Sequence, residues 1–435
     1  MLQCAKTFPT STPDLCTSIF YTAHTLGCKV NQYETSYLET GLAALGYQRA
    51  APDTAASRIS LCLVNTCAVT STSEAKSRKL IRSLAKRYPK AEVIVTGCSA
   101  TLNPEQIREL PGVTELITDK RLLSDFLIRR GLEKPPQFPD AMGTRSRMYL
   151  KIQDGCNAYC AYCIVPHARP YLTSRNCEEI VCELNHALGQ GYREIVLTGT
   201  HLGLWDIDGQ NLPSLITQLL ECEGDYRLRL SSLEASEVTE ELLALFTSHP
   251  HRLCPHLHLP MQSGSDVVLQ RMGRRQSASQ FLETTHQIRE ALTLPAITCD
   301  VIVGLPGERD SDFDQTCELV RRGGISKAHV FRYSPREGTA AAKMDDQVPE
   351  PVKNERAKIL AEIATQQRLE FVQKMQGQQE TILIEKSNDN VCQGTSARYL
   401  TTKINLQGDD SLRHQLVEVV IDSIEGEILL GRRVG

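Results

Sequence analysis

Residues 148–163 read MYLKIQDGCNAYCAYC, a strand-like stretch that runs directly into a loop with three cysteines. These are Cys156, Cys160 and Cys163, in the spacing Cys-x3-Cys-x2-Cys. Three thiolates on one short loop can wrap one corner of a [4Fe-4S] cubane, whereas a cluster used only for electron transfer normally has four cysteine ligands. One iron is then open to another ligand, as at a catalytic zinc site. The stretch therefore predicts a reactive iron–sulfur cluster on a loop after a strand.

The same strand opens a series of six alternating strand and helix patterns. The strands are short and apolar, and the helices show apolar residues at the helical period. Six such units predict a partial (β/α)6 barrel, related to the eight-unit barrel, with the chemistry on the loops after the strands. We expect strands at residues 148–153, 194–198, 227–231, 256–260, 297–303 and 329–333, and helices at 177–188, 212–221, 239–248, 277–292 and 310–322.

The preceding segment, residues 18–133, predicts a parallel α/β domain, because short apolar strands alternate with amphipathic helices. Three expected strands each run into a cysteine: residues 19–25 into Cys28, 59–65 into Cys67 and 91–96 into Cys98. Parallel strands end along one edge of their sheet, so these cysteines can converge there. Three separately buried structural cysteines are the alternative. The proline-rich stretch 134–139, KPPQFP, marks the boundary of this domain.

The last segment predicts a small antiparallel β-barrel, because strand-like stretches alternate with turn residues. A long charged helix, expected at 352–375, leads into it. The expected strands are 380–385, 398–406, 415–424 and 427–434, with turns at 388–389 and 408–410. The chain is thus expected to be a multi-domain α/β protein, with domains at residues 18–133, 142–372 and 373–435.

Composition narrows the class of protein. The chain has 435 residues, 16 cysteines and a formal net charge of −4. No apolar run is long enough to cross a bilayer and the N-terminus lacks a secretory signal, so we expect a cytoplasmic protein without a membrane partner. Disulfides are rare in that compartment, and the many cysteines therefore favour metal or redox chemistry.

One local segment is strongly basic. Residues 73–90 contain seven Lys and Arg residues against one Glu. Four of the basic residues fall along one helical stripe and are candidate RNA-binding residues: Lys76, Lys79, Arg82 and Lys86. A helix face that is only solvated is the alternative. Residues 377–435 have six Lys and Arg against nine Asp and Glu, so the charge of the last domain does not by itself predict RNA binding.

The cysteine loop, with Tyr162 before its last cysteine, resembles the signature of the radical S-adenosylmethionine (SAM) superfamily. The resemblance implies that the open iron binds the amino and carboxylate groups of SAM, which then supplies the radical chemistry. Residues after the other expected strands suit a SAM-binding rim, because glycine allows close backbone approach and Ser or Glu can bind ribose hydroxyls or an ammonium group. The expected cofactor contacts are Tyr162, Gly199, Thr200, Ser232, Glu234, Gln262, Gly304 and Arg336.

Other stretches resemble the methylthiotransferases. They read TLGCKVNQYET at 25–35, NTCAVT at 65–70, TGC at 96–98 and HLHLPMQSGSDVVLQRMGRR at 256–275. In that family the three N-terminal cysteines, here Cys28, Cys67 and Cys98, hold a second [4Fe-4S] cluster implicated in sulfur transfer. The last domain looks like the RNA-binding TRAM domain of the family. The resemblance therefore implies two [4Fe-4S] clusters and catalytic roles for all six cysteines.

Two stretches resemble one branch of this family. KVNQ at 29–32 and LTGTHLG at 197–203 look like the branch that acts on N6-threonylcarbamoyladenosine at position 37 of tRNA. The implied reaction inserts sulfur at adenine C2 and then adds a methyl group, with two SAM molecules used per product. The implied partners are a tRNA with an ANN-type anticodon reading, a flavodoxin- or ferredoxin-like reductant and a sulfur donor.

Several alternatives stay open at the level of sequence. A methylthiotransferase acting on isopentenyl-adenosine in tRNA or on a ribosomal protein would share the cysteines. A two-cluster electron carrier would need no SAM-binding rim, and a zinc-stabilised RNA-binding protein would need a closed set of four ligands. Pro170 and Arg398 depart from the family, which usually has Gly and Asn there. We expect His201 and His258 to be structural.

Overall fold

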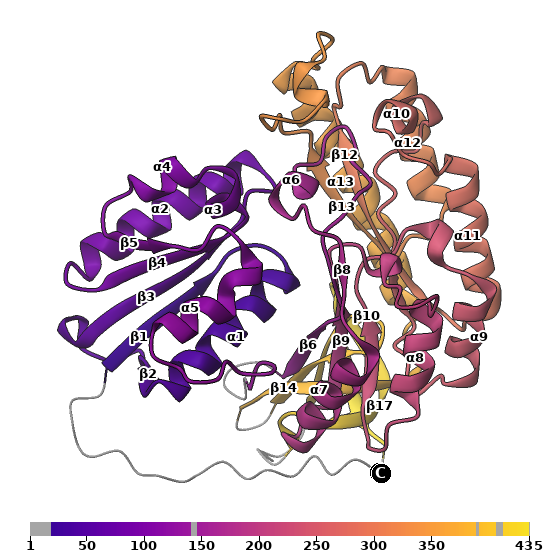
Figure 1. Ribbon diagram of the computed structural model, residues 1–435. Helices are drawn as coiled ribbons and strands as arrows, with labels where there is room; N and C mark the ends of the chain where they lie inside the picture. The colour runs from indigo at the N-terminus through magenta and orange to yellow at the C-terminus, as the bar shows by residue number, and fades with distance from the viewer. Residues whose placement is uncertain (1–18, 141–145, 389–390, 406–411, 435) are drawn as a thin grey trace.

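The computed structural model describes residues 19–140, 146–388, 391–405 and 412–434, which form three domains (Figure 1). The expected turn residues Asp389 and 408–410 lie outside the described part of the chain, as do the first residues of the first two expected domains. The N-terminal α/β domain lies on one side, the six-stranded domain on the other, and the C-terminal barrel packs beneath the latter in this view.

The N-terminal domain is a five-stranded parallel sheet in the order β2-β1-β3-β4-β5. Alternate residues of the central strand β3 face two different cores: Cys62 and Val64 pack under α2, and Leu61 and Leu63 pack under α1 and α5. The three expected strands are confirmed, and two short edge strands are added. The bounds are β1 (Ile19–Thr25), β2 (Tyr47–Arg49), β3 (Ile59–Thr66), β4 (Glu92–Gly97), β5 (Val113–Leu116), α1 (Lys29–Ala44), α2 (Ser71–Arg87), α3 (Cys98–Leu102), α4 (Pro104–Arg108) and α5 (Leu123–Arg129).

The middle domain contains the six expected parallel strands, in two three-stranded groups ordered β10-β9-β6 and β11-β12-β13. Parallel bridges between Leu228 and Leu253 and between Ser232 and His258 join the two groups, so the strands form one open barrel. The bounds are β6 (Arg147–Lys151), β9 (Glu194–Thr198), β10 (Arg227–Leu230), β11 (His256–His258), β12 (Ala296–Val303) and β13 (Lys327–Arg332).

Helices cover the outer face of this open barrel, and one large apolar core lies between them and the strands. The five expected helices and the long connecting helix are confirmed, with ends shifted by at most two residues. Their bounds are α7 (Cys177–Gly189), α8 (Leu212–Leu220), α9 (Glu240–Ser248), α11 (Ala278–Ala291), α12 (Asp310–Arg322) and α13 (Glu350–Gln373). Four short elements shape the loops: β7 (Gln153–Asp154), β8 (Thr173–Ser174), α6 (Val165–Ala168) and α10 (Asp266–Arg271).

The C-terminal domain is a closed five-stranded barrel in the order β14-β15-β16-β18-β17. Its pairs are antiparallel as expected, except that β16 and β18 run parallel. Strand β15 was not expected, because VCQGTS lacks an apolar alternation, and the strand expected from residue 398 begins only at Thr401 because Tyr399 adopts a left-handed turn conformation. The bounds are β14 (Gln379–Asn388), β15 (Val391–Ser396), β16 (Thr401–Asn405), β17 (Leu416–Glu425) and β18 (Ile428–Arg433).

Buried arginines attach this barrel to the middle domain. Arg227 and Arg229 of β10 both pair with the fully buried Glu194 of β9, at 2.6 and 2.8 Å. Their remaining N–H groups donate to four backbone carbonyls of the C-terminal barrel: Thr381, Thr395, Ser396 and Ala397. Arg398 donates back to the carbonyls of Thr293 and Leu294, so the departure from the family's asparagine is part of the same attachment.

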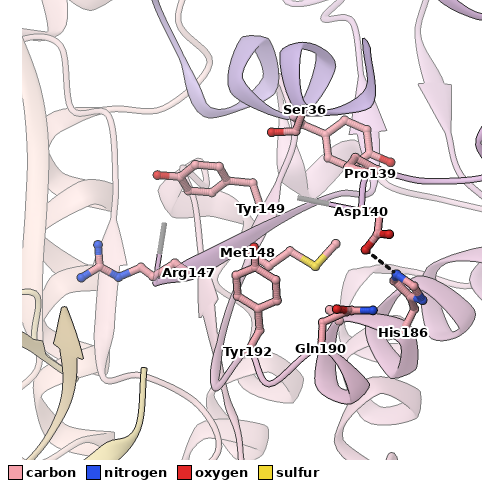
Figure 2. A pocket seen from close by; sticks show the side chains of 11 residues that line it. Ser36, Pro139, Asp140, Arg147, Met148, Tyr149, His186, Gln190 and Tyr192 are labelled. Carbon is pink, nitrogen blue, oxygen red and sulfur yellow. Dashed lines mark hydrogen bonds and ion pairs between the residues drawn. The ribbon is translucent and has the colours of Figure 1, made fainter. Parts of the chain in front are cut away.

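A small pocket lies where the linker between the first two domains crosses β6 and α7 (Figure 2). Its volume is about 40 Å³, and Tyr33, Met148 and Tyr192 are among the residues that line it. His186 bonds to Asp140 of the linker at 3.2 Å, and its ring also packs against Phe138. This pocket lies at the start of β6, at the opposite end of the strand from the cysteine loop. The two contacts of His186 hold the linker against α7 beside this pocket.

Candidate functional site

The loop that carries the first cysteine triad is tightly constrained. Gly155 has a φ of +79°, and a Cβ there would lie 2.2 Å from the carbonyl oxygen of Tyr171, so only glycine fits. The side chain of Gln153 donates to the Gly155 carbonyl at 2.7 Å. Farther along, the Cys163 amide donates to the Cys160 carbonyl at 2.9 Å, which closes the loop into a turn. Cys156, Cys160 and Cys163 are all partly exposed.

The second triad lies at the carboxyl edge of the N-terminal sheet. Cys28, Cys67 and Cys98 follow β1, β3 and β4, which are neighbours in the sheet. Gly27 has a φ of +100°, and a Cβ there would lie 3.1 Å from the Cys67 Sγ, so glycine allows the Cys28 loop to approach Cys67 closely. Cys98 is buried against Ala68 and against Ala168 of the other domain. The sheet topology therefore brings these cysteines to one edge.

Arg169 connects the two triads. It leaves α6, a few residues after the first triad, and its side chain is 3% exposed. Its guanidinium donates to both carboxylate oxygens of Glu34 at 2.7 and 3.0 Å, and to Asn31 at 2.7 Å, three residues after Cys28. It also pairs with Asp154 at 2.8 Å, two residues before Cys156. The two cysteine loops are thus held on opposite sides of one buried side chain.

The charges of this network stabilise one another. Burial by itself raises the pKa of the Asp154 carboxyl, but Lys151 and Arg169 together hold it well below its usual range. The pKa of Glu34 is also lowered, because Arg169 and then Lys151 outweigh the effect of burial. Both carboxylates are therefore ionised at neutral pH, as a buried arginine requires. Thr200 adds a hydrogen bond to Asp154 at 3.0 Å.

His201 contacts the first triad, although the sequence by itself favoured a purely structural role for it. Its Nδ1 lies 3.6 Å from the Cys156 Sγ, and its Nε2 lies 2.6 Å from a carboxylate oxygen of Glu237. Burial lowers the pKa of this imidazole, but the contacts with Cys156 and Glu237 raise it to about 10. The sequence did contain a signal for this contact, because His201 lies on the loop after β9, next to the expected cofactor contacts Gly199 and Thr200.

The thiols fit a cationic cluster. Burial raises the pKa of Cys163 to about 12 and also raises the pKa of Cys98. Iron is bound by the thiolate, so these buried sulfurs need the positive charge of irons to lose their protons. Among the described residues, no three His, Cys, Asp or Glu side chains converge closely enough to hold a single metal ion. A cubane holds its thiolates on separate irons and so spaces them farther apart.

The expected cofactor contacts lie on the loops after successive strands. Glu234 pairs with Arg274, whose guanidinium is also 4.0 Å from the Cys160 Sγ. Gln262 is 8% exposed, has a φ of +69°, and its side-chain oxygen has no hydrogen-bond partner within the described residues. Gly304 packs against Lys353, because a Cβ there would lie 2.3 Å from the Lys353 Cγ. Gly199 abuts Gln153, Ser232 bridges to His258, and Tyr162 packs against the cluster that contains Met272.

Arg336 differs from the other expected cofactor contacts. Its guanidinium crosses to the N-terminal domain, where it pairs with Glu74 at 3.0 Å and lies 3.4 Å from the Ser71 hydroxyl. Ser334 also bonds to Ser71 at 2.9 Å. The loop after β13 thus contributes to the contact between the domains, and the assignment of Arg336 to SAM stays a prediction.

The basic stripe lies on the outer face of α2. The helix begins with a capping box in which the Thr70 and Ser73 side chains each accept from the other's backbone N–H. Ser77, Ile81 and Leu84 are buried against the sheet. The four candidate RNA contacts are all exposed: Lys76, Lys79, Arg82 and Lys86. Phosphate binding by these residues stays a prediction.

Comparisons with known proteins agree with this architecture. A family model described as "Radical SAM superfamily" matches residues 150–320, and one described as "Uncharacterized protein family UPF0004" matches residues 21–119. Among solved structures, the radical SAM methyltransferase TsrM from Kitasatospora setae aligns with a TM-score of 0.56 at 13% identity, over 75% of this chain and 77% of that chain. The fold and the cysteine loop together define a radical SAM enzyme.

Relatives with similar sequences narrow the class. The chain is 36% identical to "Threonylcarbamoyladenosine tRNA methylthiotransferase MtaB" of Chlamydia pneumoniae, over 94% of this chain and 97% of that protein. It is 39% identical to the protein of the same name from Thermotoga maritima, over 83% of this chain and 85% of that protein. The chain therefore belongs to the radical SAM methylthiotransferase family. No helix in the described ranges has the length and apolar character needed to span a membrane.

Proposed function

We propose that the protein converts N6-threonylcarbamoyladenosine at position 37 of tRNA into its 2-methylthio derivative. The observation that carries this proposal is the pair of cysteine triads on facing domains, joined through Arg169. The names of the relatives at 35% to 39% identity supply the nucleoside. A relative from Jannaschia named "tRNA-2-methylthio-N(6)-dimethylallyladenosine synthase" is less similar, at 30% identity.

The proposed reaction needs a radical, because it replaces hydrogen at an unactivated adenine C2 by a methylthio group. Cys156, Cys160 and Cys163 would hold one [4Fe-4S] cluster, which with bound SAM supplies the 5′-deoxyadenosyl radical. Cys28, Cys67 and Cys98 would hold the second cluster, which we assign to sulfur delivery. One SAM would be consumed in removing the C2 hydrogen and another in providing the methyl group. A flavodoxin- or ferredoxin-like reductant and a separate sulfur donor complete the balance.

The chain's own residues position and protect the reactants. Thr200, Glu234 and Gln262 lie on the loops after β9, β10 and β11, and we assign them to the ribose and amino groups of SAM. The Arg169 network fixes the second triad against the first, which sets the distance over which sulfur must move. Packing of α6 between the domains limits the access of water to the radical. The exposed stripe on α2 would bind phosphates of a tRNA with an ANN-type anticodon reading, in the cytoplasm.

Nucleoside mass spectrometry of tRNA from cells that lack the protein tests the proposal. We expect the 2-methylthio derivative of threonylcarbamoyladenosine to disappear, and the unmodified precursor to accumulate. Loss of methylthio-isopentenyl-adenosine instead, or of a modified ribosomal protein, would transfer the assignment to another branch of the family. If the reduced protein does not cleave SAM, that result would favour the alternative function of a two-cluster electron carrier.

A further inference from the structure

A cavity of about 1000 Å³ lies between α2, the α3–α4 segment and the loop after β13. Both cysteine triads are close to it in the fold. Ile164, which lines the cavity, directly follows Cys163, and Leu102 on its other wall packs against the cluster of Ala68 and Cys98. The wall of the cavity therefore includes a chain neighbour of the first triad and a packing neighbour of the second.

Three arginines line this cavity, and Glu74 is the one acidic residue among the described lining residues that pairs with any of them. Arg336 is 8% exposed, and its Nε has no hydrogen-bond partner among the described residues. Glu74 accepts from Arg336 and from Asn103, and lies 3.7 Å from Arg78. One carboxylate is thus shared by two guanidinium groups and an amide. The other acidic residues of the lining, Glu109 and Glu337, are exposed and form no ion pair in the described part of the chain.

The remaining arginine pair points to an anionic ligand. Arg78 and Arg82 are one helical turn apart on α2 and both line the cavity. Two like charges four residues apart repel each other and destabilise a helix. Arg82 has neither an ion pair nor a hydrogen bond within the residues that the structure describes, and Arg78 has only the long contact with Glu74. A carboxylate between them would satisfy both, since guanidinium groups bind carboxylates in a two-pronged geometry.

We infer that Arg78 and Arg82 bind the threonyl carboxylate of the substrate nucleoside and so select threonylcarbamoyl-adenosine over isopentenyl-adenosine. This inference rests on the proposed function. An isopentenyl group is apolar and offers the two guanidinium groups no acceptor, so it forgoes the charged hydrogen bonds that the carboxylate would make. The cavity wall also offers apolar contact for the base through Leu102, Leu110 and Ile164.

The test compares the holoprotein's affinity for three anticodon stem-loop RNAs. They are identical except at position 37, which carries threonylcarbamoyl-adenosine, the analogue with the threonyl carboxylate replaced by an amide, or isopentenyl-adenosine. Wild type should bind the first RNA at least about tenfold more tightly than the other two, as loss of a charged hydrogen bond predicts. The Arg78→Gln/Arg82→Gln protein should lose most of this ratio, because it no longer distinguishes the acid from the amide.

Two further variants show whether a change in the ratio of RNA affinities comes from Arg78 and Arg82 in particular. Arg87→Gln removes one charge from the last turn of α2, outside the cavity, and should weaken all three RNAs equally. Arg78→Lys/Arg82→Lys keeps the charge and should lose part of the ratio, which also covers the case in which the Gln variant does not fold. If wild type prefers the threonylcarbamoyl RNA but is indifferent to the amide, or if the variants keep the full ratio, the inference is wrong while the proposed function stands. A preference of wild type for isopentenyl-adenosine would refute the proposed function itself.

Discussion

Arg169 shows how much a single residue can decide in this protein. It is buried, and it bonds simultaneously to Glu34 and Asn31 of one domain and to Asp154 of the other. A buried ion pair adds little stability when compared with apolar packing, but removing one partner leaves the others as uncompensated buried charges. The neighbouring Pro170 leaves these contacts of Arg169 in place.

We expect Arg169→Met to lower the free energy of unfolding by about 3 kcal/mol or more, because Glu34 and Asp154 would be deprived of their main counter-charge. Urea unfolding followed by fluorescence measures this change. Arg108→Gln is the matched control, since its ion pair with Glu105 is exposed and should contribute at most about 1 kcal/mol. Equal destabilisation of the two variants would show that the buried network has no special role.

The same network predicts a pH dependence. The folded-state pKa values of Asp154 and Glu34 are lowered, so their stabilisation is fully present above the unfolded values and is lost as pH falls through the folded ones. The difference in stability between wild type and Arg169→Met should therefore shrink below about pH 4. Melting temperatures of both proteins across a pH series check this, and a difference that grows on acidification would contradict it.

Gly155 gives a prediction about cluster loading. A Cβ at this position would collide with the Tyr171 carbonyl, so Gly155→Ala must displace the start of the cysteine loop. We expect lower iron and sulfide content per chain after anaerobic reconstitution, because the thiolates would no longer fit one cluster. Gly189→Ala, at a helical glycine with no atom within 4 Å of the added Cβ, should load normally. Full loading of Gly155→Ala would show that the loop tolerates the shift.

At the scale of the element, α2 combines an apolar side that packs on the sheet with a basic side that faces solvent. The apolar spacing places Ser77, Ile81 and Leu84 inward, which leaves Lys79 and Lys86 outward. The helix also follows directly on the Cys67 loop, so its exposed face lies close to the second triad. This local basic face is the basis of the predicted RNA binding in a chain whose net charge is negative.

Charge reversal tests the stripe. In Lys79→Glu/Lys86→Glu, which changes two exposed residues outside the cavity, tRNA should bind more weakly, and the slope of log affinity against log salt should fall by about 0.7 to 0.9 for each phosphate that the protein no longer neutralises. Filter binding at several salt concentrations measures both quantities. Arg129→Glu on α5, which covers the other face of the sheet, is the control and should leave the slope unchanged. An unchanged slope in the double variant would mean that this face is only solvated.

At the scale of the whole molecule, buried charged side chains join the three domains. Arg227 and Arg229 hold the C-terminal barrel at the base of the middle domain, and Arg398 adds hydrogen bonds to Thr293 and Leu294. Apolar residues at the end of α13, including Phe371 and Met375, complete the junction by entering the core of the barrel. Together these contacts fix the position of the C-terminal barrel relative to the middle domain.

We expect Arg398→Asn to loosen this junction, because asparagine cannot reach both carbonyls and the Glu380 carboxylate. Limited proteolysis should cut the segment between α13 and β14 faster than in wild type. Arg433→Asn, at an exposed site on β18, should leave the rate unchanged. If both variants resist proteolysis equally, the junction depends on the arginines of β10 alone.

The sequence alone was enough to locate the features that depend on local spacing. The six strands and helices of the middle domain follow from apolar period, and the first cysteine triad follows from its Cys-x3-Cys-x2-Cys spacing. For Cys28, Cys67 and Cys98 the pattern left separately buried cysteines as an alternative, and the resemblance to the methylthiotransferases favoured a second cluster. The folded structure was needed for what depends on residues far apart in the chain. The pairing of Arg169 with Glu34, of Arg336 with Glu74 and of His201 with Cys156 joins residues between 45 and 262 positions apart. No periodicity encodes such contacts, because they arise only when separately folded surfaces meet, and the arginine-lined cavity between the domains exists for the same reason.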